Sequence, residues 1–247
     1  DGSVKEYAQA MSAYEIALDI SEGLARVACA AEINGKVEDL RTVIEDDCEL
    51  SILTANDKEG LRVVRHTCSH VLAEAVKNLY PDAKLAIGPS IDTGFYYDFD
   101  HESFSREELD ALEKEMKKII KKGAKIERYT LPRAEAIKFM EEKGESYKVE
   151  LIQDLPVDAE ISFYSQENFV DLCAGPKLMR TKNIKAFKLI SSSGAYWRGN
   201  EKNKMLSRIY GTAFGKKDEL NAYLEQLEEA KKRDHNKLGR EMELFTT

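Results

Sequence analysis

Residues 65–80 have apolar side chains at helical spacing, and this segment constrains the fold more than any other. It reads RHTCSHVLAEAVKNLY and is followed by Pro81, which stops a helix. At ~100° of rotation per residue, one face of the predicted helix is apolar. That face carries Cys68, Leu72, Ala75 and Leu79. His66 and His70 project from the opposite face, so we expect both imidazoles to be exposed.

His66 and His70 stand four residues apart, which places their rings on neighbouring turns of one helix face. Such a pair can hold a metal ion, a water molecule or a polar substrate between its imidazoles. An exposed pair of this kind is equally typical of a solvated surface. The pair alone therefore leaves both interpretations open.

Length and composition indicate a globular protein with more than one domain. The chain has 247 residues, of which 43% are hydrophobic and 33% charged, which is typical of a soluble protein with a sizeable core. No apolar run is long enough to cross a bilayer, and the opening DGSVKEYAQAM lacks a signal-peptide pattern. The four cysteines form no Cys-x-x-Cys pair, which favours free thiols. We therefore expect a cytoplasmic protein without a membrane segment.

The net charge of −8 argues against indiscriminate binding of phosphate groups, although the positive side chains are clustered. The clusters lie at residues 117–128, 182–188 and 198–208. The first fits the solvated face of a helix whose buried side includes Ile119 and Ile120. The other two are interleaved with aromatic residues such as Trp197 and Tyr210. This mixture suits contact with a nucleic-acid backbone and unstacked bases.

Turn signals and charge patterns divide the chain into three parts. The parts are residues 1–56, 61–217 and 218–247, with a polar linker at 56–60 between the first two. The first part contains short alternating stretches, an amphipathic segment at 13–18 and an Asn34-Gly35 dipeptide that favours a tight hairpin. It predicts a small β-sheet crossed by one helix. The third part predicts a long charged helix that connects to a further domain.

The second part mixes helices with strands, so the predicted fold class is α+β. A strongly periodic helix starts after Ser105, and Glu108 stands three residues later, as in a capping box. A strand at 126–131 and a helix at 133–143 follow. Short strands then alternate with glycine-rich loops.

A second candidate site surrounds Cys173 in the sequence VDLCAGPK. The dipeptide Gly175-Pro176 forces a turn after the cysteine, so the thiol lies outside regular structure and can point into a cleft. Asp171 precedes the cysteine, and Lys177 follows it four residues later. A buried cysteine at a strand end is an equally good interpretation of this motif alone.

Two further segments offer hydrogen-bonding groups, which we expect to lie in loops. GESYK contains Lys148, and IDTGFYYDF contains Tyr97. No Ser/His/Asp triad can be assembled, and the chain has neither a P-loop nor a G-x-G-x-x-G motif in suitable surroundings. Phosphate-cradling nucleotide chemistry is therefore not expected.

Five segments carry a resemblance to a known family. They read RHTCSHVLAEAVKNLYPDAKLAIGPSIDTGFYYDFD, GESYKVELI, FVDLCAGPK, FKLISSSGAYWRGNEKNKMLSRIYGTAF and KKRDHNKLGREMELF. In this order they resemble the amino-terminal half of a bacterial threonyl-tRNA synthetase. The resemblance implies a ubiquitin-like β-grasp (TGS) domain at 1–56, an editing domain at 61–217 and a connector helix at 218–247. It also implies that ATP use and the zinc site of the synthetase belong to a catalytic core that this chain lacks.

The resemblance implies an aminoacyl-tRNA deacylase that hydrolyses seryl-tRNA made in error. Serine is threonine without one methyl group, and a missing methyl gives only ~1–3 kcal/mol of discrimination in a binding pocket. A second pocket, too small for the threonine methyl, would remove these errors. The implied partner is tRNA(Thr) mischarged with serine.

Residues of this chain that match the motifs of the family take roles from the resemblance. The catalytic candidates are His66, His70, Lys148 and Cys173, and the substrate-binding candidates are Tyr97, Asp171 and Lys177. His66 and Lys148 would orient water and handle protons, worth ~10²–10⁴-fold for a well-placed acid–base group. His70 and Cys173 would line the pocket that reads the side chain, and Asp171 would hold the seryl ammonium.

One position departs from the family pattern, which has a histidine where this chain has Lys177. A protonated lysine, with a usual pKa of ~10.4, neither accepts a hydrogen bond nor binds a metal. Related alanyl-editing domains hold zinc with two histidines, a cysteine and another histidine. This chain offers only His66, His70 and Cys173, which would bind zinc weakly. We expect editing without a metal cofactor, and slower deacylation than by a Lys177→His variant.

Two other classes of function remain open. The first is a non-catalytic module that grips the tRNA acceptor arm, which Lys177 and the missing core favour. The second is a zinc-dependent hydrolase, which would need stoichiometric zinc. We expect the chain alone to be a monomer and the full-length protein to be a homodimer, since the family dimerises through the core.

Overall fold

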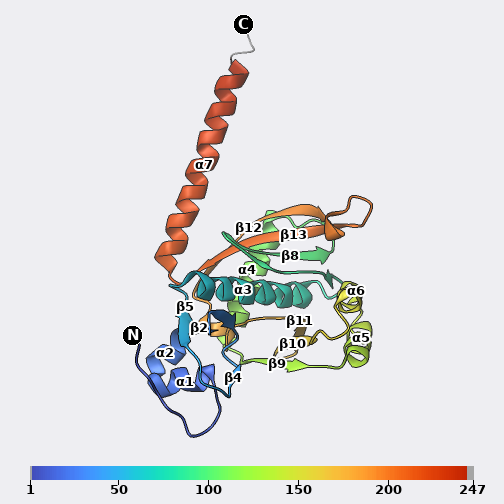
Figure 1. Ribbon diagram of the computed structural model, residues 1–247. Coiled ribbons are helices and arrows are strands. Elements are labelled where there is room, and N and C mark those ends of the chain that lie inside the picture. Colours follow the sequence, from blue (N-terminus) through green and yellow to red (C-terminus); the bar gives the residue numbers. More distant parts are fainter. Residues whose placement is uncertain (1, 244–247) are drawn as a thin grey trace.

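The computed structural model describes the backbone of residues 2–243 and the side chains of residues 2–233. It confirms the α+β fold class, with helices and several sheets in mixed order. Figure 1 shows a first region at the lower left, a larger body built around helix α3, and helix α7, which extends away from both. The candidate site lies where α3 faces the sheet β9–β11.

The first region contains two short helices and two small antiparallel sheets. Its elements are β1 (Met11–Ser12), α1 (Ala13–Ile20), α2 (Glu22–Val27), β2 (Ala28–Ile33), β3 (Lys36–Glu38), β4 (Val43–Ile44) and β5 (Leu50–Thr54). One sheet has the order β3-β2-β5, and β1 pairs with β4. Asn34 and Gly35, with φ angles of 50° and 80°, form the predicted tight turn. The prediction of one sheet crossed by one helix is wrong, because the region has two sheets and two helices. Ser21 divides the helices: it ends α1, and its hydroxyl caps α2.

The predicted linker at residues 56–60 is wrong. Helix α3 (Lys58–Leu79) begins inside it, and Asp57 accepts hydrogen bonds from the N–H and the hydroxyl of Thr54, at 2.7 and 3.1 Å. A Cβ at Gly60 would lie 1.9 Å from the carbonyl oxygen of Thr54, so the two backbones are in close contact. The polar residues of the first turn of α3 resemble those of a linker, and for this reason the composition of residues 56–60 predicted one. The first region is joined to α3 by a packed junction.

Helix α3 is the centre of the larger body, and one side of it packs on a five-stranded sheet and on α4. These elements are β6 (Lys84–Leu85), β7 (Ser90–Ile91), β8 (Gly94–Asp100), α4 (Arg106–Lys122), β12 (Ala186–Tyr196) and β13 (Met205–Phe214). Leu72, Phe95 and Ile209 are among the buried side chains that fill this core. The predicted capping box is confirmed, because Ser105 and Glu108 each bond the other's backbone N–H.

A second antiparallel sheet with two helices forms the other layer. It contains β9 (Ile126–Thr130), α5 (Arg133–Glu142), α6 (Ser146–Asp154), β10 (Ser162–Gln166) and β11 (Phe169–Leu172), with the strand order β11-β10-β9. The strand predicted at 126–131 and the helix predicted at 133–143 are both confirmed, to within a residue. Met140, Ile152 and Phe163 pack between the sheet and its helices. This packing places the end of β11 next to α3.

The remaining described elements are η1 (Thr181–Asn183), η2 (Trp197–Gly199) and α7 (Lys217–Glu243). Leu220 at the start of α7 is buried, and the ring of Tyr223 lies 5.3 Å from that of Phe214. Beyond this contact α7 extends away from the rest of the molecule (Figure 1). Among the described residues, none of the helices combines the length and the apolar character needed to span a membrane.

Candidate functional site

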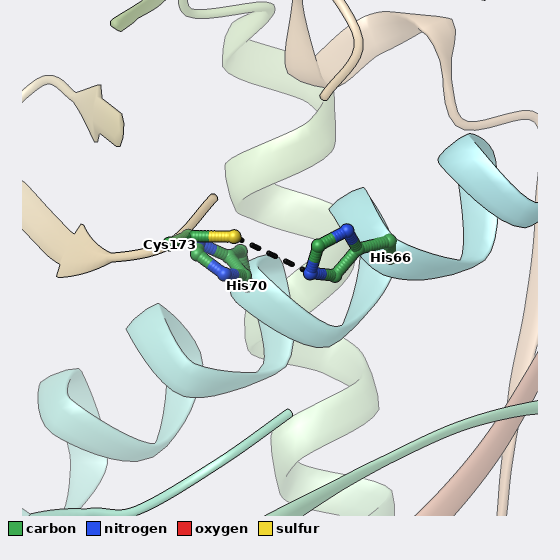
Figure 2. A group of neighbouring side chains, drawn as sticks. All are labelled: His66, His70 and Cys173. Carbon is green, nitrogen blue, oxygen red and sulfur yellow. Dashed lines mark hydrogen bonds between the residues drawn. The ribbon is translucent and has the colours of Figure 1, made fainter. Parts of the chain in front are cut away.

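Two histidines and a cysteine from distant parts of the sequence meet at one point (Figure 2). His66 and His70 lie on successive turns of α3, and Cys173 follows the last residue of β11. One nitrogen of each ring and the sulfur lie within 4.8 Å of one another. His66 Nε2 is 3.3 Å from Cys173 Sγ, and the two ring centroids are 5.7 Å apart. The structure therefore joins the two motifs that the sequence presents separately.

The expected exposure of the two imidazoles is wrong. His70 is only 5% exposed, and His66 is half-buried. Residues 173–178, called the site loop from here on, cover the histidine face of α3, and Lys177 Nζ donates a hydrogen bond to the carbonyl oxygen of His66 at 2.7 Å. Leu79, expected on the core face, is 41% exposed. Helical spacing identifies one buried face, but it does not reveal that a central helix is covered on the other face as well.

Cys173 leaves the sheet at the end of β11, as the Gly-Pro turn predicts. Its N–H donates to Ser162 O at 3.0 Å, and its carbonyl accepts from Ser162 Oγ at 2.6 Å, which fixes its backbone against β10. The N–H of Gly175 donates to the sulfur at 3.2 Å. Burial would raise the pKa of the thiol, but the charge of Lys177 and the neighbouring His70 lower it to about 6. Cys173 is therefore largely a thiolate at neutral pH.

Lys177 points into the protein and is 1% exposed. Burial lowers the pKa of its ammonium to about 8, although the negative charges of Cys173 and Asp171 act in the opposite direction. At pH 7 the side chain is therefore mostly protonated, next to the thiolate. The site therefore holds a buried positive charge at Lys177.

Both imidazoles of the site are neutral at physiological pH. Burial lowers the pKa of each ring, and the charge of Lys177 lowers it further. The pKa of His70 falls to about 4, and that of His66 lies well below its usual value. Each neutral ring keeps one nitrogen that can accept a hydrogen bond. Such a nitrogen can orient a water molecule and take a proton from it.

Asp171, Lys148 and Tyr97 form a buried polar group next to His70. Asp171 accepts a hydrogen bond from the Tyr97 hydroxyl at 2.7 Å, and Lys148 Nζ lies 2.8 Å from its other oxygen. His70 Nε2 lies 3.5 Å from the carboxylate. Burial would raise the pKa of Asp171, but Lys148 and His70 lower it below its usual value. The carboxylate is therefore charged. One oxygen accepts the Tyr97 hydrogen bond, and the other forms an ion pair with Lys148 but accepts no hydrogen bond.

The structure corrects the placement of two of these residues. Lys148 lies in helix α6 and Tyr97 in strand β8, not in loops. The glycines before each segment suggested loops, whereas Gly144 and Gly94 lie just outside α6 and at the first residue of β8. Asp171, Lys148 and Tyr97 are all at most 3% exposed. Direct access of a ligand is therefore limited to the His66 and Cys173 side of the cluster.

A cavity of about 360 Å³ opens beside His66. Its lining residues come from the first region, from α3 and β7, and from the site loop: Val37, Glu59, Arg62, Val63, His66, Pro89, Ser90, Gly175 and Pro176. A cavity of this size accommodates a small ligand. The imidazole of His66 is the acid–base group that such a ligand would meet.

The donor atoms of the site fit a zinc ion only in part. Two imidazole nitrogens and a thiolate are ligands that zinc prefers, although their separations of up to 4.8 Å are longer than the ~3.5 Å between ligand atoms of a tetrahedral zinc site. Lys177, however, places an ammonium beside the thiolate, and in a buried site this charge repels a dication. The set does not fit a resident zinc ion, and we assign no chemical step to one.

Comparisons with known proteins identify two domain families in the chain and its similarity to one class of enzyme. Residues 1–54 match the TGS domain, and residues 161–210 match the threonyl and alanyl tRNA synthetase second additional domain. The threonine–tRNA ligase of Acetivibrio thermocellus is 64% identical over 246 residues, which are 99% of this chain and 39% of that protein. Those of Clostridium perfringens strain SM101 and Clostridium acetobutylicum are 64% and 59% identical over the whole chain, and 38% and 39% of their lengths are covered. This chain is a homologue of the threonine–tRNA ligases.

The chain spans about two fifths of the length of the threonine–tRNA ligases that it matches. The resemblance of the sequence to a TGS domain followed by an editing-type domain is confirmed. The match over 161–210 includes Asp171, Cys173 and Lys177, whereas both histidines precede it. No pattern in the sequence points to Asp39 and Arg41, which the structure places against the site loop.

Proposed function

We propose that this chain is the editing part of a threonyl-tRNA synthetase and hydrolyses the ester of tRNA(Thr) mischarged with serine. The observation that carries the proposal is the meeting of His66, His70 and Cys173 beside a cavity, in a homologue of the threonine–tRNA ligases. Hydrolysis consumes one water and returns serine and a tRNA with a free terminal hydroxyl. No redox partner or nucleotide is needed for this reaction.

His66 is the residue best placed to orient the attacking water, because its neutral ring borders the cavity. With its Nε2–H directed at the Cys173 thiolate, its other nitrogen accepts a proton from the water as the bond to the ester carbon forms. His66 then returns this proton to the ribose oxygen as the bond between that oxygen and the ester carbon breaks. We assign Lys148 and Asp171 a supporting role, because both are buried and paired with each other next to His70. This replaces the direct contacts with water and with the seryl ammonium that the resemblance implies.

Discrimination between serine and threonine would rest on the space beside His66 and the site loop. An added methyl in a site that fits serine meets packed side chains, whereas a serine in a site for threonine loses only ~1–3 kcal/mol. The Cys173 thiolate offers the seryl ammonium a partner of opposite charge. Rejection by bulk and attraction by charge would together select the mischarged tRNA.

The test is to offer the chain seryl-tRNA(Thr) and threonyl-tRNA(Thr) and to follow the release of each amino acid. We expect release of serine, retention of threonine, and no effect of a chelator. His66→Ala should lower the rate by ~10²–10⁴-fold, as expected for the loss of an acid–base group. His101→Ala is the matched control, because His101 stacks on Phe104 outside the site. Equal rates for the wild type and His66→Ala would refute the proposal.

A second candidate function is a tRNA-binding module without hydrolytic activity. Lys177 favours it, because a buried ammonium occupies the site where the family has a histidine. It predicts binding of tRNA and no release of serine, so the same experiment separates the two functions. In either case we propose tRNA as the partner, a monomeric chain and a cytoplasmic location.

A further inference from the structure

Arg41, a residue of the first region, holds the backbone of the site loop. Its Nη1 donates to the carbonyl oxygen of Lys177 at 3.1 Å, and its Nη2 donates to that of Leu178 at 2.9 Å. Nη2 also donates to the carbonyl of Ile126 in β9. One guanidinium thus serves three carbonyls from two segments, for which its planar fork of donors is suited. Arg41 and Lys177 are 136 positions apart in the sequence.

Asp39 completes this contact from the same turn of the first region. Its Oδ2 accepts hydrogen bonds from the N–H of Lys177 at 3.0 Å and from the hydroxyl of Tyr164 at 2.8 Å. Its Oδ1 accepts from the N–H and Nη1 of Arg41, at 2.9 and 2.8 Å, so the guanidinium is held in place. Asp39 is 8% exposed. Both polar groups of the Lys177 backbone are therefore held by the first region.

Tyr164 connects Asp39 to Gly175, near the start of the site loop. Its hydroxyl is held by Asp39, and its ring lies 5.6 Å from the guanidinium carbon of Arg41. Gly175, with φ of 77°, packs on this hydroxyl so closely that a Cβ would lie 2.0 Å from it. The N–H of Gly175 in turn donates to the sulfur of Cys173. A continuous line of contacts thus runs from the first region to the thiolate.

We infer that Asp39 and Arg41 are positioning residues of the editing site, through which the first region sets the geometry of Cys173 and Lys177. This inference rests on the proposed function for its kinetic consequence. While the backbone of Lys177 is held by Asp39 and Arg41, its side chain reaches the carbonyl of His66 on the other side. Without Arg41 three carbonyls lose their donor, and a shift of the site loop by about 1 Å is enough to lower a rate by ~10²-fold.

The experiment compares Arg41→Ala, Arg41→Lys and Tyr164→Phe with the wild-type chain. Arg26→Ala is the matched control, because Arg26 is an exposed arginine of the same region. With seryl-tRNA(Thr), we expect Arg41→Ala to lower kcat by ~10–10²-fold with KM within about twofold. Arg41→Lys should retain part of the rate, since an ammonium replaces some of the donors but not the fork. Wild-type kcat in a folded Arg41→Ala variant would overturn the inference.

A second readout does not depend on hydrolysis. Alkylation of Cys173 by iodoacetamide, followed by peptide mass spectrometry as a function of pH, reports the environment of the thiol. In Arg41→Ala we expect the pH midpoint to rise by ~1 unit, because Lys177 no longer stays beside the sulfur. An unchanged midpoint would overturn the inference even if the wild-type chain hydrolysed no seryl-tRNA. If Arg41→Ala fails to fold, Arg41→Lys and Tyr164→Phe decide by the same two measurements.

Discussion

The helix wall of the site, formed by His66 and His70 on α3, and the loop wall, formed by residues 173–178, meet in one site but depend on the sequence in different ways. The helix wall follows from local spacing, because two residues four apart on any helix present their rings together. The loop wall depends on contacts with residues more than a hundred positions away, such as Asp39 and Arg41. The helix wall can therefore be predicted from the sequence, whereas the shape of the loop wall cannot.

A substitution in the buried polar group beside the two walls should have the largest effect. Asp171→Asn removes the charge that pairs with buried Lys148, and an unpaired buried ammonium destabilises a protein by ~3–5 kcal/mol. We expect a decrease of that size in the free energy of unfolding, measured by urea titration at pH 7. The matched control is Asp110→Asn, because Asp110 forms an exposed pair with Arg106 and should change stability by less than ~1 kcal/mol. Similar losses in both variants would contradict the buried pairing.

The pH dependence of stability tests the helix wall. The pKa of His70 is about 4 in the folded chain, against its usual 6.5. Between these values the unfolded chain binds a proton at residue 70 that the folded chain does not, so the free energy of unfolding falls as the pH is lowered from 6.5 to 4. The loss reaches about 3 kcal/mol at the lower end. Urea titrations across this window should show a shallower pH slope for His70→Gln than for the wild type; parallel slopes would refute the burial of a neutral ring.

The charge of the loop wall can be changed by one substitution. Lys177→His removes the buried ammonium, supplies a neutral ring and should increase seryl-tRNA hydrolysis by ~10-fold. It should also increase affinity for zinc, because a fourth ligand joins the two histidines and the cysteine. Lys185→His, at an exposed lysine, is the control for adding a histidine. Equal hydrolysis and equal zinc binding in Lys177→His and the wild type would mean that this position is dispensable.

A substitution far from both walls should have the smallest effect. Ser105→Ala removes the hydroxyl that caps α4 and should lower the free energy of unfolding by ~1 kcal/mol. Thermal unfolding measures this loss, and the rate of seryl-tRNA hydrolysis should not change. A decrease in hydrolysis for this variant would mean that general stability, and not the geometry of the two walls, determines the rate.

The local elements of the fold could be predicted from the sequence. The hairpin at Asn34-Gly35, the capping box of Ser105 and Glu108 and the central helix all depend on neighbours within a few positions. Such signals are complete within a single sequence because turn and cap geometry is set locally. For the same reason the resemblance to the synthetase family could be read from short motifs.

The surroundings of the site could not be predicted. Spacing placed His66 and His70 on a solvent face, whereas the site loop covers them. Glycines suggested a loop for Lys148, which lies in α6 and is buried there together with Tyr147 and Ile152. Burial by another segment is a property of the tertiary fold, and a single sequence contains no signal for it. The same limit applies to the contact of Arg41 with the site loop.

The close approach of Gly60 to the Thr54 backbone has a practical consequence for anyone who divides this protein. The junction between the first region and α3 is packed, so neither proteolysis nor a shortened gene would separate the two parts without loss of contacts. Removal of the first 57 residues would strip α3 of its first-turn neighbours and leave the carbonyls of Lys177 and Leu178 without their donor. A version of the chain without the first region would therefore have a site loop of altered geometry.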